Sequence, residues 1–262
     1  MAVSRSGVYV VLDVELIDNG VWLSLCFLTA RYPTGEVMAV EEFYVDRSQH
    51  EIKNPTKKAF WEKHAEALDY NLKRGMGKPE EVAEASVCAY VQDLRARNPH
   101  FFLVSDNPGL DILILDTILA KYNHEPLSQR APDVYAQVLC TWSYKQSLAR
   151  IFHVKTASLF TAPFVKMLLQ QYPMAATRFR MPRNSKAAKE EIRLPHTVLR
   201  DCSVTLATFF RCLDLTAALS QFVQYQETVM CPPRAMMPPP PVFHHAPIYA
   251  PVFISAPAPP PG

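Results

Sequence analysis

Short apolar blocks separated by turn signals make up the first part of the chain. Residues 7–17 form a β-branched, apolar block, and residues 21–31 and 36–46 form two more. Asp18–Gly20 and Pro33–Gly35 separate the blocks, and Asn and Gly tolerate the positive φ of tight turns. The pattern predicts three consecutive strands in an antiparallel meander.

Helical spacing of apolar residues replaces the short blocks after residue 50. Pro55 suits a first helical turn, and residues 59–72 carry apolar positions at helical spacing. Further helices are predicted over 79–95 and 110–122. Residues 101–104, Phe-Phe-Leu-Val, predict a short buried strand between them.

The second half predicts one more strand and two more helices. The strand is expected at 133–141, and the helices at about 156–172 and 197–224. A meander followed by strand–helix alternation predicts a mixed sheet flanked by helices. The predicted fold class is α/β (α+β), in one domain over residues 1–225.

Proline enrichment marks the remaining residues, 226–262. The segment contains Pro232-Pro233, Pro238–Pro241 and Pro259–Pro261, and it lacks a pattern that can pack. We predict a disordered or polyproline II tail, with a docking peptide for a protein partner as the alternative. The whole chain, 262 residues with 49% hydrophobic, fits one domain of about 200–230 residues plus a tail.

Charge and cysteine content narrow the class of protein only slightly. The net charge is +2 and the pI about 8.2, which neither requires nor excludes a nucleic-acid partner. The six cysteines are scattered without a C-x-x-C pair, which argues against a zinc site or a disulfide framework and for a reducing compartment. They are Cys26, Cys88, Cys140, Cys202, Cys212 and Cys231.

The N-terminus and hydropathy pattern bear on localisation. Only Met1–Ser6 precede the first predicted strand, which leaves no room for a signal peptide. No apolar run approaches the roughly 20 residues needed to span a bilayer. We expect a soluble intracellular protein without a membrane partner, and the cytoplasm and nucleus are not distinguished.

Two carboxylates interrupt the first predicted strand, at Asp13 and Glu15. Residues i and i+2 of a strand share a face, so both side chains point the same way. Two anions in an apolar environment resist ionisation, and a divalent cation relieves the repulsion. The pattern indicates a metal site. The alternative is a pair of carboxylates that reach solvent at the rim of the sheet.

Further acidic residues follow at later element starts. Asp111 opens a predicted helix, and His196 and Asp201 form H-x-x-x-x-D near the start of another. Each has an ordinary interpretation: Asp111 as an acid favoured by the helix dipole, and His196 as a core or surface histidine. Asp106 competes with Asp111 but has the character of a turn residue.

In this order the motifs resemble those of the DEDDh branch of RNase H-like (DnaQ-like) 3′→5′ exonucleases, over about residues 7–220. D-x-E matches Asp13–Glu15, the Asn four residues before an Asp matches Asn107–Asp111, and H-x-x-x-x-D matches His196–Asp201. The chain is also similar to the exoribonuclease-like group that includes phage and viral exonucleases. The resemblance implies an RNase H-like, mixed five-stranded sheet.

The resemblance also implies a mechanism with two divalent cations, Mg²⁺ or Mn²⁺, about 3.5–4 Å apart. Asp13 would bridge both ions, and Glu15, Asp111 and Asp201 would complete their shells. His196 would take the proton from the attacking water, since imidazole titrates near neutral pH. The implied partners are 3′ ends of single-stranded RNA or DNA, with RNA slightly favoured.

Three residues depart from the family pattern without removing a predicted ligand. Arg200 stands where a second acidic residue is frequent and could alter the local field, Leu110 where an aromatic residue is common, and Cys202 where alanine is usual. Three roles stay open for Asn107, namely orienting the substrate, bracing the loop and capping the helix. Trp22 and Phe27 are expected in the core.

A basic stretch precedes the histidine motif and is opposed only by Glu190 and Glu191. It could deliver a phosphate backbone to the metals, with Arg180, Arg183 and Arg200 as candidate contacts. The alternative is a solvated loop. The stretch comprises Arg178, Arg180, Arg183, Lys186, Lys189, Arg193 and Arg200.

The sequence therefore predicts a metal-dependent 3′→5′ exonuclease that hydrolyses phosphodiester bonds at single-stranded ends. Two alternatives stay open. One is a non-catalytic module on the same fold that binds nucleic acid or protein. The other is a proofreading partner of a polymerase, tethered by the proline-rich tail. The sequence makes no prediction of oligomeric state.

Overall fold

The meander predicted at the N-terminus is confirmed. The computed structural model describes residues 7–126, 138–171 and 194–230. Strands β1 (Gly7–Asp18), β2 (Val21–Tyr32) and β3 (Glu36–Tyr44) pair antiparallel in sequence order. Gly20 and Gly35 adopt φ of 67° and 70° in the two turns, a conformation that glycine reaches without a steric penalty.

Two further strands extend the sheet on the other side of β1. Strand β4 (Phe101–Ser105) pairs parallel with β1, and β5 (Val138–Cys140) pairs parallel with β4. The five strands of the described residues are ordered β3-β2-β1-β4-β5. The mixed sheet is therefore as predicted, and β1 lies at its centre.

The helical segment after the meander is two helices instead of one. Helix α1 (Pro55–Lys63) begins where the Asn54 side chain accepts hydrogen bonds from two backbone amides, as an N-cap does. It ends at His64, whose φ of −118° and ψ of 39° are not helical, and α2 (Ala65–Gly75) follows at once. The predictions for α3 (Glu80–Arg97) and α4 (Pro108–Lys121) are confirmed.

Among the described residues of the second half, one helix was not indicated by the sequence. Strand β5 occupies the end of the predicted strand 133–141, of which residues 133–137 lie outside the described part. Helix α6 (Thr141–Ile151) begins immediately afterwards. It buries few side chains, namely Thr141, Leu148 and Ala149, so its apolar stripe is too thin to stand out in the sequence.

The helix predicted over 156–172 is interrupted. A 3₁₀ helix, η2 (Thr156–Thr161), is followed by α7 (Pro163–Gln171). Pro163 disfavours a helical conformation in the preceding residue, and Ala162 is accordingly extended, with φ of −59° and ψ of 134°. The last helix, α10 (Val198–Met230), runs beyond its predicted end at 224.

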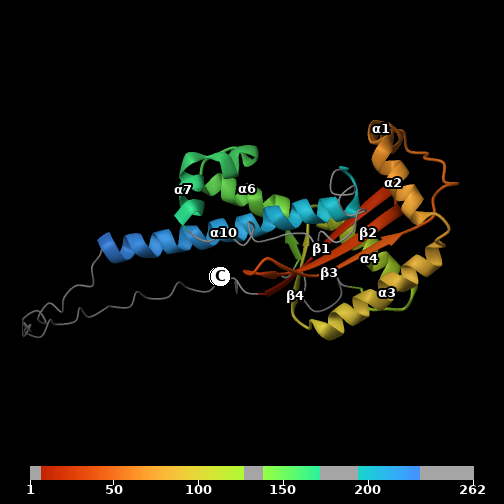
Figure 1. The fold of residues 1–262 in the computed structure, drawn as a ribbon, viewed down its shortest axis with the longest axis horizontal. Coiled ribbons are helices and arrows are strands. Elements are labelled where there is room, and N and C mark those ends of the chain that lie inside the picture. The colour runs from red at the N-terminus through yellow and green to blue at the C-terminus, as the bar shows by residue number, and fades with distance from the viewer. Residues whose placement is uncertain (1–6, 127–137, 172–193, 231–262) are drawn as a thin grey trace, which may run out of the picture. The chain divides into compact units, whose positions relative to one another are not determined.

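Strand β1 is buried on both faces, which explains its nearly continuous apolar run. Val10, Leu12 and Val14 pack against α3 and α4 on one face. Tyr9 and Val11 pack against α10 on the other face. Figure 1 shows α10 along one side of the sheet, with α3 on the opposite side. Trp22 and Phe27, 3% and 1% exposed, are core residues as expected.

Two smaller apolar clusters attach the remaining helices. Helices α1 and α2 cover the end of the β1–β2 hairpin through Trp61 and Ala67. The Trp61 indole Nε1–H also donates to the carbonyl oxygen of Leu16, at 3.1 Å. Helices α6, η2 and α7 pack on α10 around Cys212 and Leu215. Five cysteines, all except Cys231, fall within the described residues, and none of these five forms a disulfide there.

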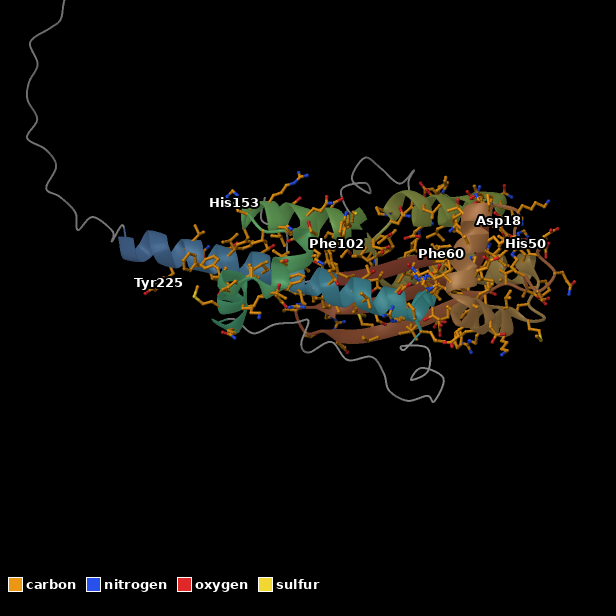
Figure 2. The ribbon with its side chains drawn as sticks, turned by 90° about the horizontal axis from the view of Figure 1, so that it is seen from above. Asp18, His50, Phe60, Phe102, His153 and Tyr225 are labelled. Atoms are coloured by element: carbon orange, nitrogen blue, oxygen red, sulfur yellow. The ribbon has the colours of Figure 1, made fainter. Side chains whose placement is uncertain are left out.

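The loop before α1 is held by Asp18 at the end of β1. Its carboxylate accepts hydrogen bonds from the backbone amides of Asn19 and Lys53, both at 2.8 Å. His50 Nε2 lies 3.6 Å from Asp18 Oδ2, and Figure 2 shows the two side chains together beside α1. These contacts fix the start of a helix that borders the site described below.

Helix α10 is more apolar than predicted, since no apolar run of membrane-spanning length was expected in the chain. Over Val198–Tyr225 it is long and apolar enough, by length and composition alone, to cross a bilayer. However, 56% of its most apolar window is buried inside the protein. The core helix of a water-soluble protein meets the same criterion, so this is weak evidence for a membrane span.

The chain divides into two compact units, Met1–Phe222 and Val223–Gly262. The first holds the sheet and the site. The second is described only as far as Met230, within α10. Residues 231–262 of the proline-rich segment lie outside the described residues, so the predicted nature of that tail stays a prediction.

Candidate active site

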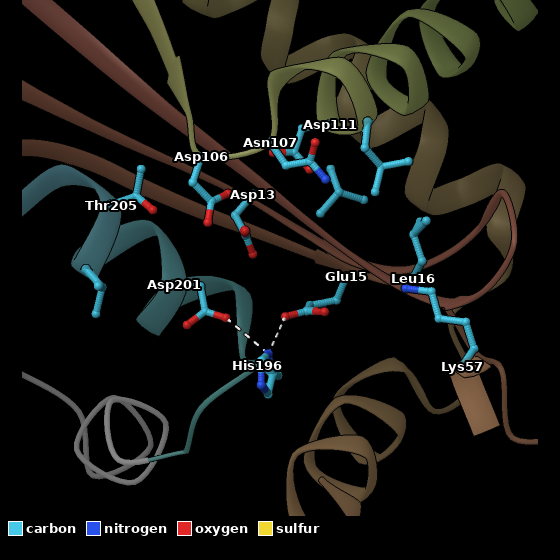
Figure 3. A pocket seen from close by; sticks show the side chains of 13 residues that line it. Asp13, Glu15, Leu16, Lys57, Asp106, Asn107, Asp111, His196, Asp201 and Thr205 are labelled. Carbon is cyan, nitrogen blue, oxygen red and sulfur yellow. Dashed lines mark ion pairs between the residues drawn. The ribbon is translucent and has the colours of Figure 1, made fainter. Parts of the chain in front are cut away.

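A cavity of about 380 Å³ opens where β1 and β4 end and α4 and α10 begin. It holds all six matched residues of the three motifs, Asn107 included (Figure 3). Asp13 and Glu15 lie on β1, Asp111 and Asp201 lie in the first turns of α4 and α10, and His196 lies in the loop before α10. The lining residues are Asp13, Val14, Glu15, Leu16, Lys57, Asp106, Asn107, Leu110, Asp111, His196, Asp201, Val204 and Thr205.

Asp13 and Glu15 project from the face of β1 that α10 covers. The alternation of the strand places them in line with Tyr9 and Val11, and both line the cavity as the D-x-E spacing suggested. Asp13 Oδ2 is buried and has no hydrogen-bond partner within the described residues. A buried acceptor without a donor is costly, so this oxygen points to a missing cationic or donor group.

Asp111 is held by the loop between β4 and α4. The Ser105 hydroxyl donates to Asp111 Oδ2, and the backbone amide of Asn107 donates to Ser105 Oγ at 2.9 Å. Asn107 is the N-cap residue of α4, but its side chain makes no capping hydrogen bond. The capping interpretation of Asn107 is therefore not observed, and its amide lines the cavity instead.

His196 lies in a tight loop with a φ of 62°, a conformation uncommon for a residue other than glycine. The Asn71 side chain of α2 donates to the carbonyl oxygen of His196 at 3.1 Å and to that of Ala67 at 2.9 Å. Ser24 of β2 in turn donates to Asn71 Oδ1 at 3.0 Å. A buried polar chain thus ties the histidine loop to the sheet.

The His196 ring is oriented by two aromatic neighbours and two carboxylates. Its centroid lies 4.8 Å from that of Phe60 and 4.2 Å from that of His64. Its Nδ1 lies 3.8 Å from Glu15 Oε1 and 3.8 Å from Asp201 Oδ2, as the dashed lines in Figure 3 mark. The ring therefore faces the carboxylates from the mouth of the cavity.

Asp201 occupies the first turn of α10. Its sequence neighbours, Arg200 and Cys202, make different contacts. Arg200 Nη1 donates to Asp201 Oδ1 at 3.4 Å, so its positive charge lies directly beside the carboxylate. Cys202 is fully buried, with Sγ 3.5 Å from the carbonyl oxygen of Cys26 and 3.8 Å from that of Val11. A small side chain at position 202 lets the helix approach the sheet closely enough to present Asp201.

Burial and mutual repulsion raise the pKa values of the carboxyl groups in the cavity. Burial, followed by the charge of Glu15, raises the pKa of Asp13 well above its usual range. Burial raises the pKa of Glu15 to about 8 and that of Asp111 to about 7. Burial also raises the pKa of Asp201, although His196 and Arg200 oppose the shift. Such crowding of anions is typical of a site that takes cations.

The ligand atoms fall into two neighbouring groups. Carboxylate oxygens of Asp13, Asp106 and Asp111 lie within 4.8 Å of one another, as do ligand atoms of Glu15, His196 and Asp201. Hard divalent cations prefer carboxylate oxygen ligands. The unpartnered oxygen of Asp13 adds an acceptor with no other use among the described residues, so the residues present fit divalent-cation binding.

Two charged lining residues were not assigned to the site from the sequence. Asp106, set aside there as a turn residue, is exposed and groups with Asp13 and Asp111. The position of Asp106 directly after strand β4 was the feature of the sequence that could have indicated its place in the site. Lys57 lines the cavity from α1, and its charge lowers the pKa of Glu15 against the larger effect of burial. No spacing indicated Lys57, because only packing brings α1 to the end of β1.

The predicted basic contacts are placed in part. Arg200 lies at Asp201, beside the cavity. Arg180 and Arg183, with the rest of the basic stretch between 178 and 193, lie outside the described residues. Their contact with a phosphate backbone stays a prediction.

Strand order and direction define the class of the fold. An antiparallel β3-β2-β1 meander joined to parallel β4 and β5 is the RNase H-like sheet, with acidic residues on β1, at the start of α4 and on α10. No family model matches the chain, and no curated protein matches it.

Several solved structures are similar to this chain. Exonuclease I in a product-bound structure is 11% identical with a TM-score of 0.44, and the likeness covers 86% of this chain and 46% of that one. E. coli exonuclease I in complex with a dA16 oligonucleotide is 12% identical, with a TM-score of 0.42 and coverages of 85% and 43%. This chain thus spans less than half the length of exonuclease I.

A smaller nuclease gives a likeness over nearly its whole length. The nuclease domain of 3′hExo, a DEDDh family member bound to rAMP, is 12% identical with a TM-score of 0.37. The likeness covers 86% of this chain and 95% of that domain. At these TM-scores none of the likenesses carries an argument about activity.

Proposed function

We propose that this protein is a metal-dependent 3′→5′ exonuclease that hydrolyses phosphodiester bonds at single-stranded nucleic-acid ends. The observation that supports it most is the cavity at the end of β1. The pKa values of Asp13, Glu15, Asp111 and Asp201 are all raised, and one buried carboxylate oxygen of Asp13 has no hydrogen-bond partner within the described residues. A site for a neutral ligand would not need four carboxyl groups close together.

Two divalent cations, Mg²⁺ or Mn²⁺, would be held by Asp13, Glu15, Asp111 and Asp201, with Asp106 as an additional ligand. When bound, they would supply activation of a water molecule and stabilisation of the leaving oxygen. Ser105 orients the Asp111 carboxylate through its hydroxyl. Such partners of metal ligands fix ligand orientation and strengthen binding.

His196 is the proposed general base. Burial is the main cause that lowers its pKa, so the ring is neutral at neutral pH and free to accept a proton. Phe60 and His64 limit rotation of the ring. Glu15 and Asp201, each 3.8 Å from Nδ1, stabilise the imidazolium that forms after proton transfer.

Nucleic acid as the substrate is supported by basic and polar groups around the carboxylates. Lys57, Asn107 and Arg200 border the cavity or its ligands and suit phosphate oxygens. Among the similar structures, exonuclease I was captured with a dA16 oligonucleotide and 3′hExo with rAMP. For this chain both RNA and DNA stay candidate substrates, with RNA slightly favoured from the sequence resemblance alone.

The test is degradation of matched 3′-labelled and 5′-labelled single strands of RNA and DNA with Mg²⁺ or Mn²⁺. We expect metal-dependent loss of the 3′ label, release of nucleoside monophosphates, and no cutting of circular single strands. Asp13→Asn should abolish the activity. The control is Asp93→Asn, which removes an exposed carboxylate of α3 paired with Arg97 and should leave the rate unchanged.

The alternative of a non-catalytic module predicts a different outcome. A folded protein that binds oligonucleotides but degrades neither polymer, with either metal, would favour that module. Cleavage of circular strands would instead make the protein an endonuclease. The proofreading alternative predicts retention of a polymerase by the full chain and not by a chain lacking residues 231–262.

A further inference from the structure

Lys57 brings a permanent positive charge into a cavity of carboxylates. Among the residues that line this cavity, all of them in the described part of the chain, it is the lone lysine or arginine. Helix α1 carries Lys57, and the start of that helix is fixed by the Asn54 cap and by the contact of Asp18 with the backbone amide of Lys53. The fold therefore holds this cation at the site.

The ammonium group of Lys57 has no ion-pair partner among the described residues. Its Nζ lies 5.7 Å from the centre of the Phe60 ring, and the side chain is half-buried. Burial raises the pKa of Glu15 and the charge of Lys57 lowers it, so the two groups are close enough to interact. A half-buried ammonium group without an ion-pair partner suits an anionic group of a bound molecule.

The two ends of the cavity differ. At one end the space continues past Asp106 into a neighbouring cavity of about 260 Å³. At the other end Lys57 lies beside Leu16, and Glu15 lies between Lys57 and Asp201 (Figure 3). A strand longer than one nucleotide leaves on the side where the space continues. The 3′ group of its last nucleotide then faces Lys57.

The charge at the 3′ end decides whether Lys57 has a partner there. A 3′ hydroxyl is neutral, whereas a terminal phosphate carries about −1.5 to −2 charges at pH 7. The carboxylate of Glu15 repels such a group, and a lysine at the same end of the cavity offsets the repulsion. The position of Lys57 therefore favours an anionic 3′ end.

We propose that Lys57 allows the enzyme to degrade strands that end in a 3′-phosphate, by binding that phosphate through its ammonium group. The inference rests on the proposed exonuclease function and names a substrate class for the same site. It makes Lys57 a specificity-determining residue, because a 3′ hydroxyl end does not offer this contact.

The reaction on such a strand has a distinctive first product. Water adds to the phosphorus on the 5′ side of the last nucleoside, and the bond from this phosphorus to the 3′ oxygen of the preceding nucleotide breaks. That oxygen takes a proton and becomes a 3′ hydroxyl. The first product is therefore a nucleoside 3′,5′-bisphosphate, and each later product is a nucleoside 5′-monophosphate.

The test compares matched single strands that end in a 3′-phosphate or a 3′ hydroxyl, with products separated by chromatography and identified by mass spectrometry. We expect wild-type protein to release the bisphosphate first. Lys57→Ala should lower the rate of this first turnover, relative to that on the 3′ hydroxyl strand, by about 10-fold to 100-fold, as loss of a hydrogen bond to a charged group does. Lys57→Arg keeps the charge and should retain most of the ratio.

Lys58→Ala is the matched control, because Lys58 is the exposed next residue of α1 and does not line the cavity. It should leave the ratio of the two rates unchanged. Later turnovers on the phosphorylated strand act on 3′ hydroxyl ends, so they provide a second control within each reaction. Thermal unfolding of each variant shows whether it is folded.

Binding can be measured without turnover in an inactive Asp13→Asn protein. Fluorescence anisotropy with 5′-labelled strands gives the Kd for each type of 3′ end. Adding Lys57→Ala to this protein should raise the Kd of the 3′-phosphate strand by about 10-fold relative to that of the 3′ hydroxyl strand.

The outcomes separate this inference from the function on which it rests. Degradation of the 3′ hydroxyl strand with the 3′-phosphate strand left intact would overturn the inference and leave the exonuclease standing. Release of inorganic phosphate before the first nucleotide would overturn it as well, because the phosphate would then be removed first. If neither strand is degraded, the exonuclease proposal fails and the anisotropy decides. Loss of preference in Lys57→Ala would then keep the terminal-phosphate contact, and an unchanged ratio of Kd values would overturn it.

Discussion

Asp13 carries a carboxylate oxygen that is buried and has no partner within the described residues. Around it the pKa values of Asp13, Glu15, Asp111 and Asp201 are all raised, chiefly by burial. A group that is harder to ionise in the folded chain than in the unfolded chain opposes folding once it loses its proton. The site is therefore a source of instability that bound cations can remove.

This predicts an unusual pH dependence for the metal-free protein. The contribution of each carboxyl group to the stability of the folded chain is complete below its pKa in the unfolded chain. This contribution is lost as the pH rises to the pKa in the folded chain, from 4.5 to about 8 for Glu15 and from 3.8 to about 7 for Asp111. Between pH 4.5 and 8 the unfolding midpoint should fall, by on the order of 5 °C. Differential scanning calorimetry in a chelator measures it.

Two additions sharpen that measurement. Mg²⁺ or Mn²⁺ should restore the midpoint at pH 8, and Asp13→Asn should flatten the decline because one of the repelling charges is gone. Hydrogen bonds lower the pKa of Asp18 and Asp46, so those groups act in the opposite sense and only below about pH 4. A midpoint that rises from pH 4.5 to 8 without metal contradicts the prediction.

At the scale of elements, three segments far apart in sequence meet at the carbonyl of His196. Ser24 on β2 and Asn71 on α2 form the buried hydrogen-bonded chain that ends at the histidine loop. Because the loop adopts a positive φ, this chain holds a conformation that the residue itself does not favour. Asn71 is a positioning residue, since it touches the backbone of His196 and not the reacting atoms.

Asn71→Ala should lower kcat by about 10-fold to 100-fold with little change in KM, because the base is displaced while the substrate still binds. It should also destabilise the fold by ~1–3 kcal/mol, since the Ser24 hydroxyl loses its acceptor. Steady-state kinetics and urea unfolding measure the two effects. Asn98→Ala, which removes a side chain that donates to the Leu94 carbonyl oxygen in α3, is the control and should leave kcat unchanged.

The packing of α10 on the sheet determines where Asp201 lies. Cys202 fits against the carbonyl oxygens of Val11 and Cys26 without any exposed surface. Cys202→Leu should overpack this contact and destabilise the protein by ~1–3 kcal/mol, with loss of activity as Asp201 moves. Cys202→Ala should retain activity. Urea unfolding and the exonuclease assay check both, and an active, stable leucine variant would refute the close-approach argument.

At the scale of the whole molecule, a near-neutral net charge of +2 cannot by itself attract a polyanion. Attraction must come from local clusters, and the basic stretch before His196 is the main candidate in the sequence. Arg180→Ala with Arg183→Ala should weaken binding of single strands and flatten its salt dependence, because fewer counterions are released. Fluorescence anisotropy over a range of salt concentrations measures this. Arg31→Ala with Arg97→Ala, two exposed arginines paired with Glu36 and Asp93, is the control, and equal slopes for both pairs would reject the idea.

Local sequence patterns were sufficient to predict the meander of strands β1 to β3. Alternation, β-branched residues and glycine turns specify β1 to β3 over short distances, and the D-x-E spacing places two carboxylates on one face of β1. These strand features follow from neighbours within a few positions, so the sequence by itself determined them. The grouping of Asp13, Glu15, Asp111, His196 and Asp201, which are far apart in the sequence, came instead from the resemblance of the three motifs to one family.

Tertiary structure decided what depends on contacts between distant segments. The break at His64, the helix α6 and the interruption at Pro163 each reflect packing or local sterics that periodicity does not encode. Lys57 and Asp106 join the cavity because α1 and the end of β4 converge on β1. The raised pKa values of the carboxyl groups likewise follow from burial, which is a property of the folded chain and not of any single residue.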